Sequence, residues 1–373
     1  MKKYVGMFVF FIAVLSFVFI TDAIGAVPSP FVRGIRPLGM GGAFTAVAND
    51  YNALMYNPAG LANLDKWYFT LLQVDVGTHQ KTLDFITWFI DNQSRLTGGD
   101  LSTWKQTDID KLSNAGVKLS VNANVLTFVG RHFGIGGFGK VNADVSLDSG
   151  IFIPKATIDV SADIIIPVSY AAYISGLDDF FNENLGGGRL AMGGTVKIVN
   201  RRTLKETRNA LELSALNPTS YLDKIQDSKT GAGIDLGFLF DAEEDIDSTF
   251  ALVVNDLYTN IGGDIPKLNL RFGYAWKPEF DIAILSSPII ALDINGINDS
   301  DLTFFNKVHM GAEIEFIKWL SIRGGFYQGY PSYGLGIPLG FLRFEFASYG
   351  TELGKYPGQI EERNYIGTLA VRF

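Results

Sequence analysis

The chain has 373 residues, with 31 lysines and arginines against 39 aspartates and glutamates, which gives a formal net charge of −8. It contains no cysteine, and this excludes disulfides, thiolate metal sites and a cysteine nucleophile. An acidic chain without a basic cluster also argues against nucleic acid as a partner.

Residues 1–25 have the pattern of a secretory signal peptide. Lys2 and Lys3 precede an apolar run over 7–20, which ends in small residues. The run is about 14 residues long, whereas a spanning helix needs roughly 20. We expect cleavage after residue 25; cleavage after Ala26 is also compatible, and an uncleaved anchor is the alternative. No cysteine stands at the exit, so a lipoprotein is not expected.

The rest of the chain is rich in apolar residues but has no long apolar run. Hydrophobic residues make up 47% of the sequence, and the mean hydropathy is +0.17. Helical membrane spans are not expected, because no later stretch approaches the roughly 18 apolar residues that they need. Membrane strands reconcile these observations, since they distribute apolar residues in alternation.

The segment 26–65 is expected to form a small helical unit. Asn57 suits a helix N-cap, and Pro58 suits the first helical position. The glycines within 39–42 permit tight packing or positive φ angles. Because the helical pieces are too short to be stable alone, they need a container, and a barrel interior is one.

Residues 66–373 are expected to form one antiparallel transmembrane β-barrel, an all-β fold. Apolar and polar residues alternate with period 2 along this part of the chain, for example over 117–125. We count fourteen strands, an even number that returns the C-terminus to the side of the N-terminus. Twelve strands fit nearly as well, since 281–292 and 332–339 carry the weakest signals. The fourteen segments are 66–76, 116–129, 132–146, 156–172, 188–202, 230–241, 247–256, 268–277, 281–292, 305–317, 319–328, 332–339, 342–349 and 363–373.

The connections between these strands are mostly long at one end and short at the other, as in outer-membrane barrels. Both termini are therefore placed in the periplasm. The loop 77–115 is expected to contain helix, because Phe85, Trp88, Phe89 and Ile90 follow a helical pattern. The long connections are 77–115, 203–229, 257–267, 293–304 and 350–362.

Several charged residues lie opposite the apolar face of their strands and are expected to point into the lumen. At mid-bilayer on the lipid face, a lysine or arginine would cost about 2–4 kcal/mol. These charges either line a polar path or hold the helical unit of 26–65 in place, and the sequence leaves both open. They are Lys118, Asp159, Asp163, Arg271, Glu313, Glu315, Arg343 and Glu345.

The chain ends in an alternating segment whose last residue is aromatic. Tyr365, Leu369, Val371 and Phe373 share one face of the expected last strand. This ending resembles the C-terminal signal of bacterial outer-membrane barrels, and it implies two partners, the barrel-assembly machinery and outer-membrane lipid. The alternative for this segment alone is the buried last strand of a soluble sheet.

Signals for catalysis or metal binding are weak, so neither enzyme activity nor a cofactor is expected. His79, His132 and His309 lie far apart and lack metal-ligand spacing. The glycine-rich run 134–139 matches a dinucleotide-binding pattern, but it lies inside an expected strand and opens no helix. We expect those glycines to pack against a plug. The acidic run 241–247 is expected to be a solvated turn.

The N-terminal motif resembles the hatch of FadL-type outer-membrane transporters. Glycine-x-glycine-x-alanine, then an acidic residue and then Asn-Pro-Ala precede the first strand. The likeness is closer to the PorV/PorQ-like branch, which favours Met-Gly-Gly-Ala and Tyr-Asn-Pro-Ala-Gly-Leu-Ala, here at 40–43 and 56–62. It extends weakly over most of the chain, but only the hatch motif is specific. The hatch residues are Gly39, Gly41, Gly42, Ala43, Asp50, Asn57, Pro58 and Ala59.

The resemblance implies a barrel that admits hydrophobic small molecules, fatty-acid-like or aromatic, through a hatch-gated lumen across the bacterial outer membrane. The PorV-like branch implies an alternative, a structural or secretion-associated barrel that binds a secretion or surface protein. A wide apolar pocket at the outer end would favour the first function, and a completely filled lumen the second.

Overall fold

The computed structural model describes residues 28–96, 105–113, 116–148, 155–176, 187–209, 228–242, 247–278, 282, 284–317 and 319–373. The expected signal peptide at 1–25 lies outside the described residues. So do most of the 203–229 loop and the centre of the acidic run at 241–247.

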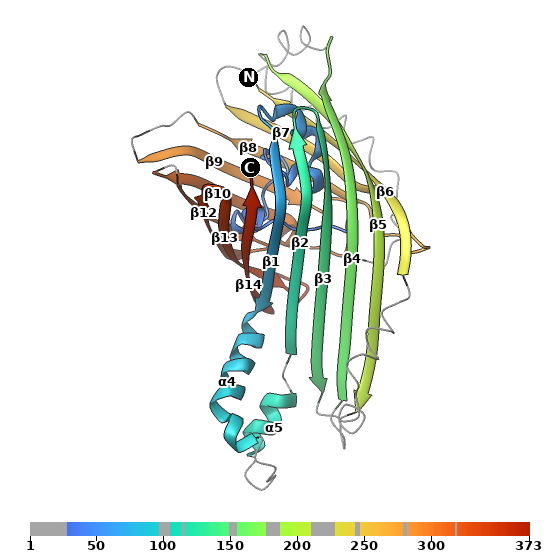
Figure 1. The fold of residues 1–373 in the computed structure, drawn as a ribbon, viewed down its shortest axis with the longest axis vertical. Coiled ribbons are helices and arrows are strands. Elements are labelled where there is room, and N and C mark those ends of the chain that lie inside the picture. Colours follow the sequence, from blue (N-terminus) through green and yellow to red (C-terminus); the bar gives the residue numbers. More distant parts are fainter. Residues whose placement is uncertain are drawn as a thin grey trace.

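The described chain forms a closed antiparallel barrel of fourteen strands in sequence order, and β1 pairs with β14 to close it (Figure 1). The prediction of fourteen strands is confirmed, and the alternative of twelve is wrong. The strands are β1 Tyr68–His79, β2 Gly116–Gly130, β3 Phe133–Asp148, β4 Lys155–Tyr173, β5 Arg189–Asn209, β6 Ser228–Asp241, β7 Ser248–Ile261, β8 Asn269–Trp276, β9 Leu285–Asn295, β10 Val308–Phe316, β11 Leu320–Tyr327, β12 Tyr330–Leu339, β13 Leu342–Glu352 and β14 Glu361–Arg372.

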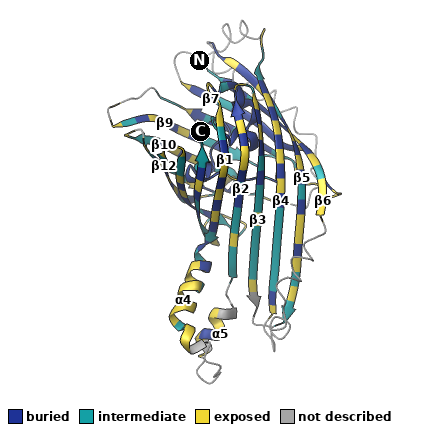
Figure 2. Cartoon of the chain, in the orientation of Figure 1, coloured by how far each residue is buried: buried dark blue, intermediate teal, exposed yellow. Residues whose placement is uncertain are grey.

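The outer face of the barrel is apolar because alternate residues of each strand point away from the lumen. On β4, Ile164, Ile166 and Val168 are exposed, whereas Asp163 and Ile165, on the alternate positions, are buried. Figure 2 shows the same alternation of exposed and buried bands along β2, β4 and β5. A closed barrel with this exterior is suited to a lipid bilayer.

Several strands are longer than the sequence suggests, β5 and β7 most of all. β5 runs to Asn209 because its last seven residues pair with β4, from Thr203 opposite Ser161 to Asn209 opposite Lys155. The connection expected at 203–229 therefore begins as strand. β7 continues to Ile261, which pairs with Gly231, so the expected 257–267 loop also begins as strand.

Helices occupy the connection between β1 and β2 and project from one end of the barrel (Figure 1). They are α4 Gln80–Leu96 and α5 Gln106–Ser113, which confirms the helical prediction for 77–115. We refer to this end as the α4 end and to the opposite one, where β14 finishes, as the terminal end. None of the described helices has both the length and the hydropathy needed to cross a membrane.

The segment between residue 28 and β1 lies inside the barrel near the terminal end (Figure 1). We call this segment the hatch; it contains α2 Ile35–Gly39, α3 Ala53–Tyr56 and the 3₁₀ helix η1 Pro58–Asn63. Hatch side chains such as Phe44 and Leu61 are fully buried and form the main hydrophobic core together with the inner wall. One more short helix, α9 Phe304–Lys307, lies between β9 and β10.

Candidate functional site

Asn57 joins three parts of the structure through one buried amide. Its Oδ1 accepts a hydrogen bond of 3.0 Å from the backbone N–H of Ala59 and so caps η1, with Pro58 in the first turn. Its Nδ2 donates to the carbonyl of Thr45 at 3.0 Å and to that of Phe238 on β6 at 3.4 Å. The expected N-cap therefore also links the hatch to the barrel wall.

The Asn57–Pro58–Ala59 segment contacts the wall where the wall has no side chains. Gly193 on β5 and Gly237 on β6 are cross-strand partners. A Cβ atom on Gly193 would lie 2.5 Å from the Ala59 nitrogen, and one on Gly237 would overlap the Asn57 side chain. The hatch backbone thus packs directly on the sheet.

The first part of the hatch motif, residues 39–42, also packs against glycines of the barrel wall. Gly41 and Gly42 have positive φ angles of 64° and 82°, which side chains rarely adopt. The backbone of Met40 and Gly41 lies against Gly311 of β10 and Gly325 of β11, which also pair across strands, whereas Gly42 lies against His309 and Tyr327. Gly39 packs in the same way against Gly334 of β12. Glycines on both sides allow this close approach.

Asp293 on β9 receives three hydrogen bonds from the hatch residues that follow Ala43. Its Oδ2 accepts from the backbone N–H groups of Phe44 and Thr45, both at 2.9 Å, and from the Thr45 hydroxyl at 2.6 Å. Asp293 was not among the predicted lumen charges, because the strand was expected to end at 292. An aspartate one residue beyond that strand, on the lumen side of the alternation, is the signal that could have revealed it.

A chain of ion pairs runs from the hatch to the wall. Arg36 contacts Asp50 at 2.9 Å and reaches Glu313 with two nitrogens, at 2.9 and 2.6 Å. Glu313 also bonds Arg323, which in turn lies 3.3 Å from Glu345. Burial alone would lower the pKa of the Arg36 guanidinium, but the Glu313 and Asp50 carboxylates outweigh it and raise that pKa.

The network ends on β13 and β14. Glu345 accepts from Arg343 at 3.1 Å and lies 3.7 Å from Arg372. The structure therefore brings together Asp50, Glu313, Arg343 and Glu345, four of the predicted residues. Sequence reasoning did not identify Arg36, Arg323 or Arg372 as members. Glu315 is half-buried and lies outside this network.

The other predicted charges lie elsewhere on the inner wall. Lys118 pairs with Glu362 at 2.6 Å, and Asp163 pairs with Arg201 at 2.7 Å. Asp159 is 3.3 Å from Lys205, and both side chains are largely exposed at the α4 end of β4 and β5.

Arg271 on β8 is buried but contacts aromatic rings instead of a carboxylate. Its guanidinium carbon lies 4.4 Å from the Phe31 ring centroid and 5.6 Å from that of Tyr56, and both rings belong to the hatch. Such cation–π contacts stabilise a charge by about 0.5–2 kcal/mol.

The hatch forms the floor of a chamber of about 550 Å³ in the lumen. Its floor includes Phe31, Arg33 and Tyr56 of the hatch. Its walls come from strands on both sides of the barrel, and they are mixed polar and aromatic. Wall residues include Asn122, Lys140, Asn142, Asn269, Arg271, Asn295, His309, Tyr327 and Tyr349.

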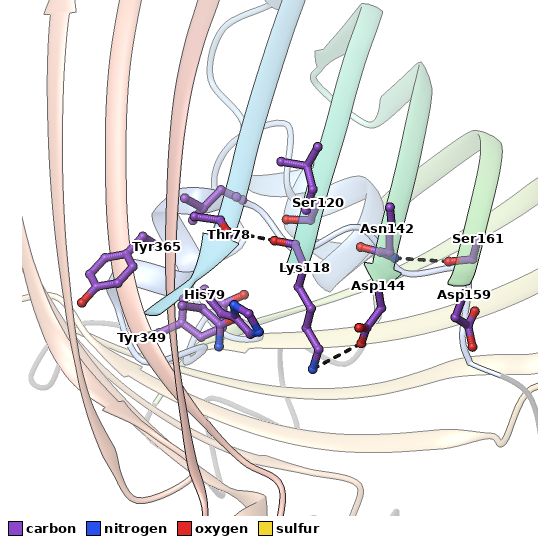
Figure 3. A pocket seen from close by; sticks show the side chains of 15 residues that line it. Thr78, His79, Lys118, Ser120, Asn142, Asp144, Asp159, Ser161, Tyr349 and Tyr365 are labelled. Carbon is purple, nitrogen blue, oxygen red and sulfur yellow. Dashed lines mark hydrogen bonds and ion pairs between the residues drawn. The ribbon is translucent and has the colours of Figure 1, made fainter. Parts of the chain in front are cut away.

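A smaller recess of about 290 Å³ lies next to the chamber. It shares Ser120, Asn142, Tyr349 and Ile366 with the chamber, so the two spaces adjoin. Figure 3 shows Lys118 in this recess, extended toward Asp144 at 3.5 Å. The recess also borders Gly77 to His79, which precede α4, and so leads toward the α4 end.

The residues of the expected C-terminal signal differ in exposure and contacts. Leu369 points outward and is exposed, Val371 is half-buried, and the Tyr365 hydroxyl donates to Gln80 at 2.6 Å. Phe373 stacks with Phe69 and with Phe341, each at a ring-centroid distance of 6.3 Å, and forms an exposed aromatic group at the terminal end.

The three histidines and the glycine-rich run have structural contacts. Each histidine uses Nδ1 in a local hydrogen bond: His79 with Thr82, His132 with Ala171, and His309 with the Gly41 carbonyl. The run 134–139 lies within β3. A Cβ on Gly134 would meet Leu54 of the hatch, as expected, whereas those on Gly136, Gly137 and Gly139 would face residues of the neighbouring β2. Within the described ranges, no group of three potential metal ligands comes together.

No protein-family model and no curated protein matches this sequence. Solved structures with a similar fold include a deletion mutant of the TodX monoaromatic hydrocarbon channel, at 12% identity and TM-score 0.49, which covers 91% of this chain and 97% of that one. The CymD monoaromatic hydrocarbon channel has 11% identity, TM-score 0.48, and coverage of 94% and 98%. The Pseudomonas putida toluene transporter TodX has 12% identity, TM-score 0.44, and coverage of 94% and 99%. Similarity at this level does not transfer the ligands of those channels to this chain.

Proposed function

We propose that this chain is an outer-membrane barrel that mediates passage of hydrophobic small molecules, fatty-acid-like or aromatic, through a hatch-gated lumen. One observation carries the proposal. The lumen holds a chamber of about 550 Å³ whose floor is the hatch and whose adjoining recess leads toward the α4 end. A small molecule entering there would reach the hatch before it could go further.

The α4 end would face outward and both termini the periplasm. Most of the long connections, including the one with α4, lie at the α4 end, as is usual for the outer side of such barrels, whereas the long connection between β4 and β5 lies at the terminal end. The stacked rings of Phe69, Phe341 and Phe373 at the terminal end suit the lipid–water interface. The outward-facing apolar side chains would contact outer-membrane lipid.

Gating would occur by movement of the hatch within an intact barrel. No described hatch residue belongs to the closed sheet, so a moving hatch leaves the strand pairing unchanged. The hatch is held by hydrogen bonds and ion pairs, chiefly through Asn57, Asp293 and Arg36. These bonds can part and re-form because each is individually modest compared with the whole barrel ladder.

A second candidate function, a scaffold for a secretion or surface protein, is favoured by α4. This helix projects beyond the strands and carries exposed apolar residues on one stripe, Leu83, Ile86 and Ile90. A helix face of this kind can bind a protein partner. A scaffold would not need to pass small molecules, and this difference separates the two candidates.

The test is uptake of labelled oleate and of labelled toluene by cells that carry the barrel, compared with cells that carry an empty vector. Arg36→Gln should change uptake, because it removes the ion pairs to Asp50 and Glu313. The matched control is Arg202→Gln, which removes an exposed arginine from β5. Heat-modifiable gel mobility would verify equal folding. Uptake at the vector level from a folded barrel would overturn the transport function and favour the scaffold.

A further inference from the structure

The chamber is positively charged although the chain is acidic. Four cations line it, Arg33, Lys140, Lys267 and Arg271, together with one carboxylate, that of Asp299. Asp299 lies 3.5 Å from Lys267, so that carboxylate is already engaged. Three cations therefore remain around one cavity in a protein whose net charge is −8.

Among the described residues, these three cations form no ion pair. Lys140 donates to the backbone carbonyl of Phe31 at 3.2 Å. Arg271 lies over the ring of the same Phe31, and its Nε is buried without a hydrogen-bond partner. Arg33 is exposed to the cavity, with its guanidinium 5.7 Å from the Tyr327 ring centroid.

Carboxylates near the floor are committed to other partners. Arg201 donates two hydrogen bonds to the Asp163 carboxylate, each 2.7 Å long. Asp293 uses Oδ2 to hold Phe44 and Thr45 of the hatch. Asp293 also interacts electrostatically with Arg271, and Asp163 with Lys140, so the wall offsets the positive charge of the floor only in part.

We infer that the chamber floor binds the carboxylate of a compact aromatic acid, an inference that rests on the proposed passage function. A cation in a desolvated site is costly unless an opposite charge completes it, and a carboxylate matches the donor geometry of arginine. A bound carboxylate would accept from Arg271 Nε and would also be in reach of the positive charges of Arg33 and Lys140.

The surroundings of the cations favour an aromatic body over a long acyl chain. The rings of Phe31 and Tyr56, with centroids 4.9 Å apart, lie beside Arg271, and Tyr327 lies beside Arg33. The rest of the lining carries many hydroxyl and amide groups beside a few apolar side chains such as Leu268 and Leu302, and a long apolar tail would gain little against the polar groups. These polar residues are Ser120, Asn122, Asn142, Asn269, Asn295 and Asn306.

The test compares three probes on the full-length barrel in lipid nanodiscs, with empty nanodiscs as the baseline. They are 4-fluorobenzoate and 4-fluorotoluene, which share a ring and differ in charge, and laurate. Saturable binding is followed by fluorine NMR for the first two and by calorimetry for laurate. Arg33→Gln and Arg271→Gln should each weaken 4-fluorobenzoate binding by about tenfold, since each removes a charged hydrogen-bond donor.

Control variants distinguish an effect of lost charge from an effect of failed folding. Arg271→Lys retains a cation and should retain measurable 4-fluorobenzoate binding. Lys229→Gln removes a cation that is paired with Asp264 outside the chamber lining and should leave binding unchanged. Heat-modifiable mobility identifies any variant that fails to fold.

The outcomes separate this inference from the proposed function. Equal 4-fluorobenzoate affinity in all variants overturns the cationic site. Passage of the same three probes is measured in parallel with the barrel reconstituted in liposomes. Binding and passage of 4-fluorotoluene or laurate without 4-fluorobenzoate binding overturns the aromatic-acid ligand and leaves the passage function standing. Failure of all three probes to bind or pass overturns both.

Discussion

Gly193 on β5 and Gly237 on β6 are cross-strand partners, and the backbone of Asn57 to Ala59 packs on the bare strip that they create. A side chain at either position would occupy space that the hatch now fills. The contact that closes the lumen here therefore depends on the absence of side chains at Gly193 and Gly237 as well as on the hatch motif itself.

Gly193→Ala should loosen the hatch without opening the barrel. The new Cβ would lie 2.5 Å from the Ala59 nitrogen, a distance that requires the hatch to shift. We expect a higher conductance in planar lipid bilayers than for the unmodified protein. Gly194→Ala is the neighbouring control, because a Cβ there meets Leu236 at an ordinary 3.6 Å. Equal conductance for the two variants would show that the seal does not depend on this contact.

Asn57→Ala should destabilise the hatch locally. It removes the η1 cap, which costs about 1 kcal/mol, and leaves the buried carbonyl of Thr45 without the Asn57 donor. Amide hydrogen exchange should accelerate in η1 and around Thr45, with β4 unchanged. Asn57→Ser restores a capping oxygen and should slow exchange again in η1 alone. Uniform acceleration in hatch and barrel would contradict a local role.

The strands and their lumen faces could be predicted from period-2 alternation, which is a local property of the chain. The places where this alternation breaks could not be predicted. Leu126 on β2 has a positive φ of 50°, and the register against β3 shifts between Val125 and Phe128. Beyond this bulge Val129 faces the hatch core, whereas unbroken alternation from Val125 would have turned it to lipid.

The hatch motif could be recognised from sequence, but its partners on the wall could not. Arg36 meets Glu313 across 277 positions of sequence, and the residues between them carry no signal of that contact. Glu313 and Glu345 were expected in the lumen from alternation alone. Their connection through Arg323 depends on the closed register of β10 to β13, which only the folded barrel supplies.

Ile166→Arg tests whether the exposed apolar face contacts lipid. Ile166 lies well inside β4 and is 42% exposed, so a charge there would cost about 2–4 kcal/mol at mid-bilayer depth. We expect this loss in urea-induced unfolding from lipid vesicles. Ile158→Arg lies close to the α4 end of the same strand and should cost only about 0–1 kcal/mol. Equal, small effects at both positions would contradict a membrane-embedded exterior.

Glu313→Gln should destabilise the protein far more than Glu315→Gln, two residues away on the same strand. Glu313 receives two nitrogens of Arg36 and one of Arg323, so the neutral amide leaves two arginines without their shared carboxylate. Breaking a buried ion pair in this way costs about 3–5 kcal/mol. Glu315 lies outside the network, and its substitution should change the free energy of unfolding by no more than about 0.5 kcal/mol. The same vesicle unfolding experiment measures both.

In the Glu313→Gln variant, limited proteolysis should also cut the hatch before the barrel, because Arg36 loses its anchor on the wall. Comparable losses for the two variants, or a hatch as resistant as in the unmodified protein, would show that the ion-pair chain does not hold the hatch closed.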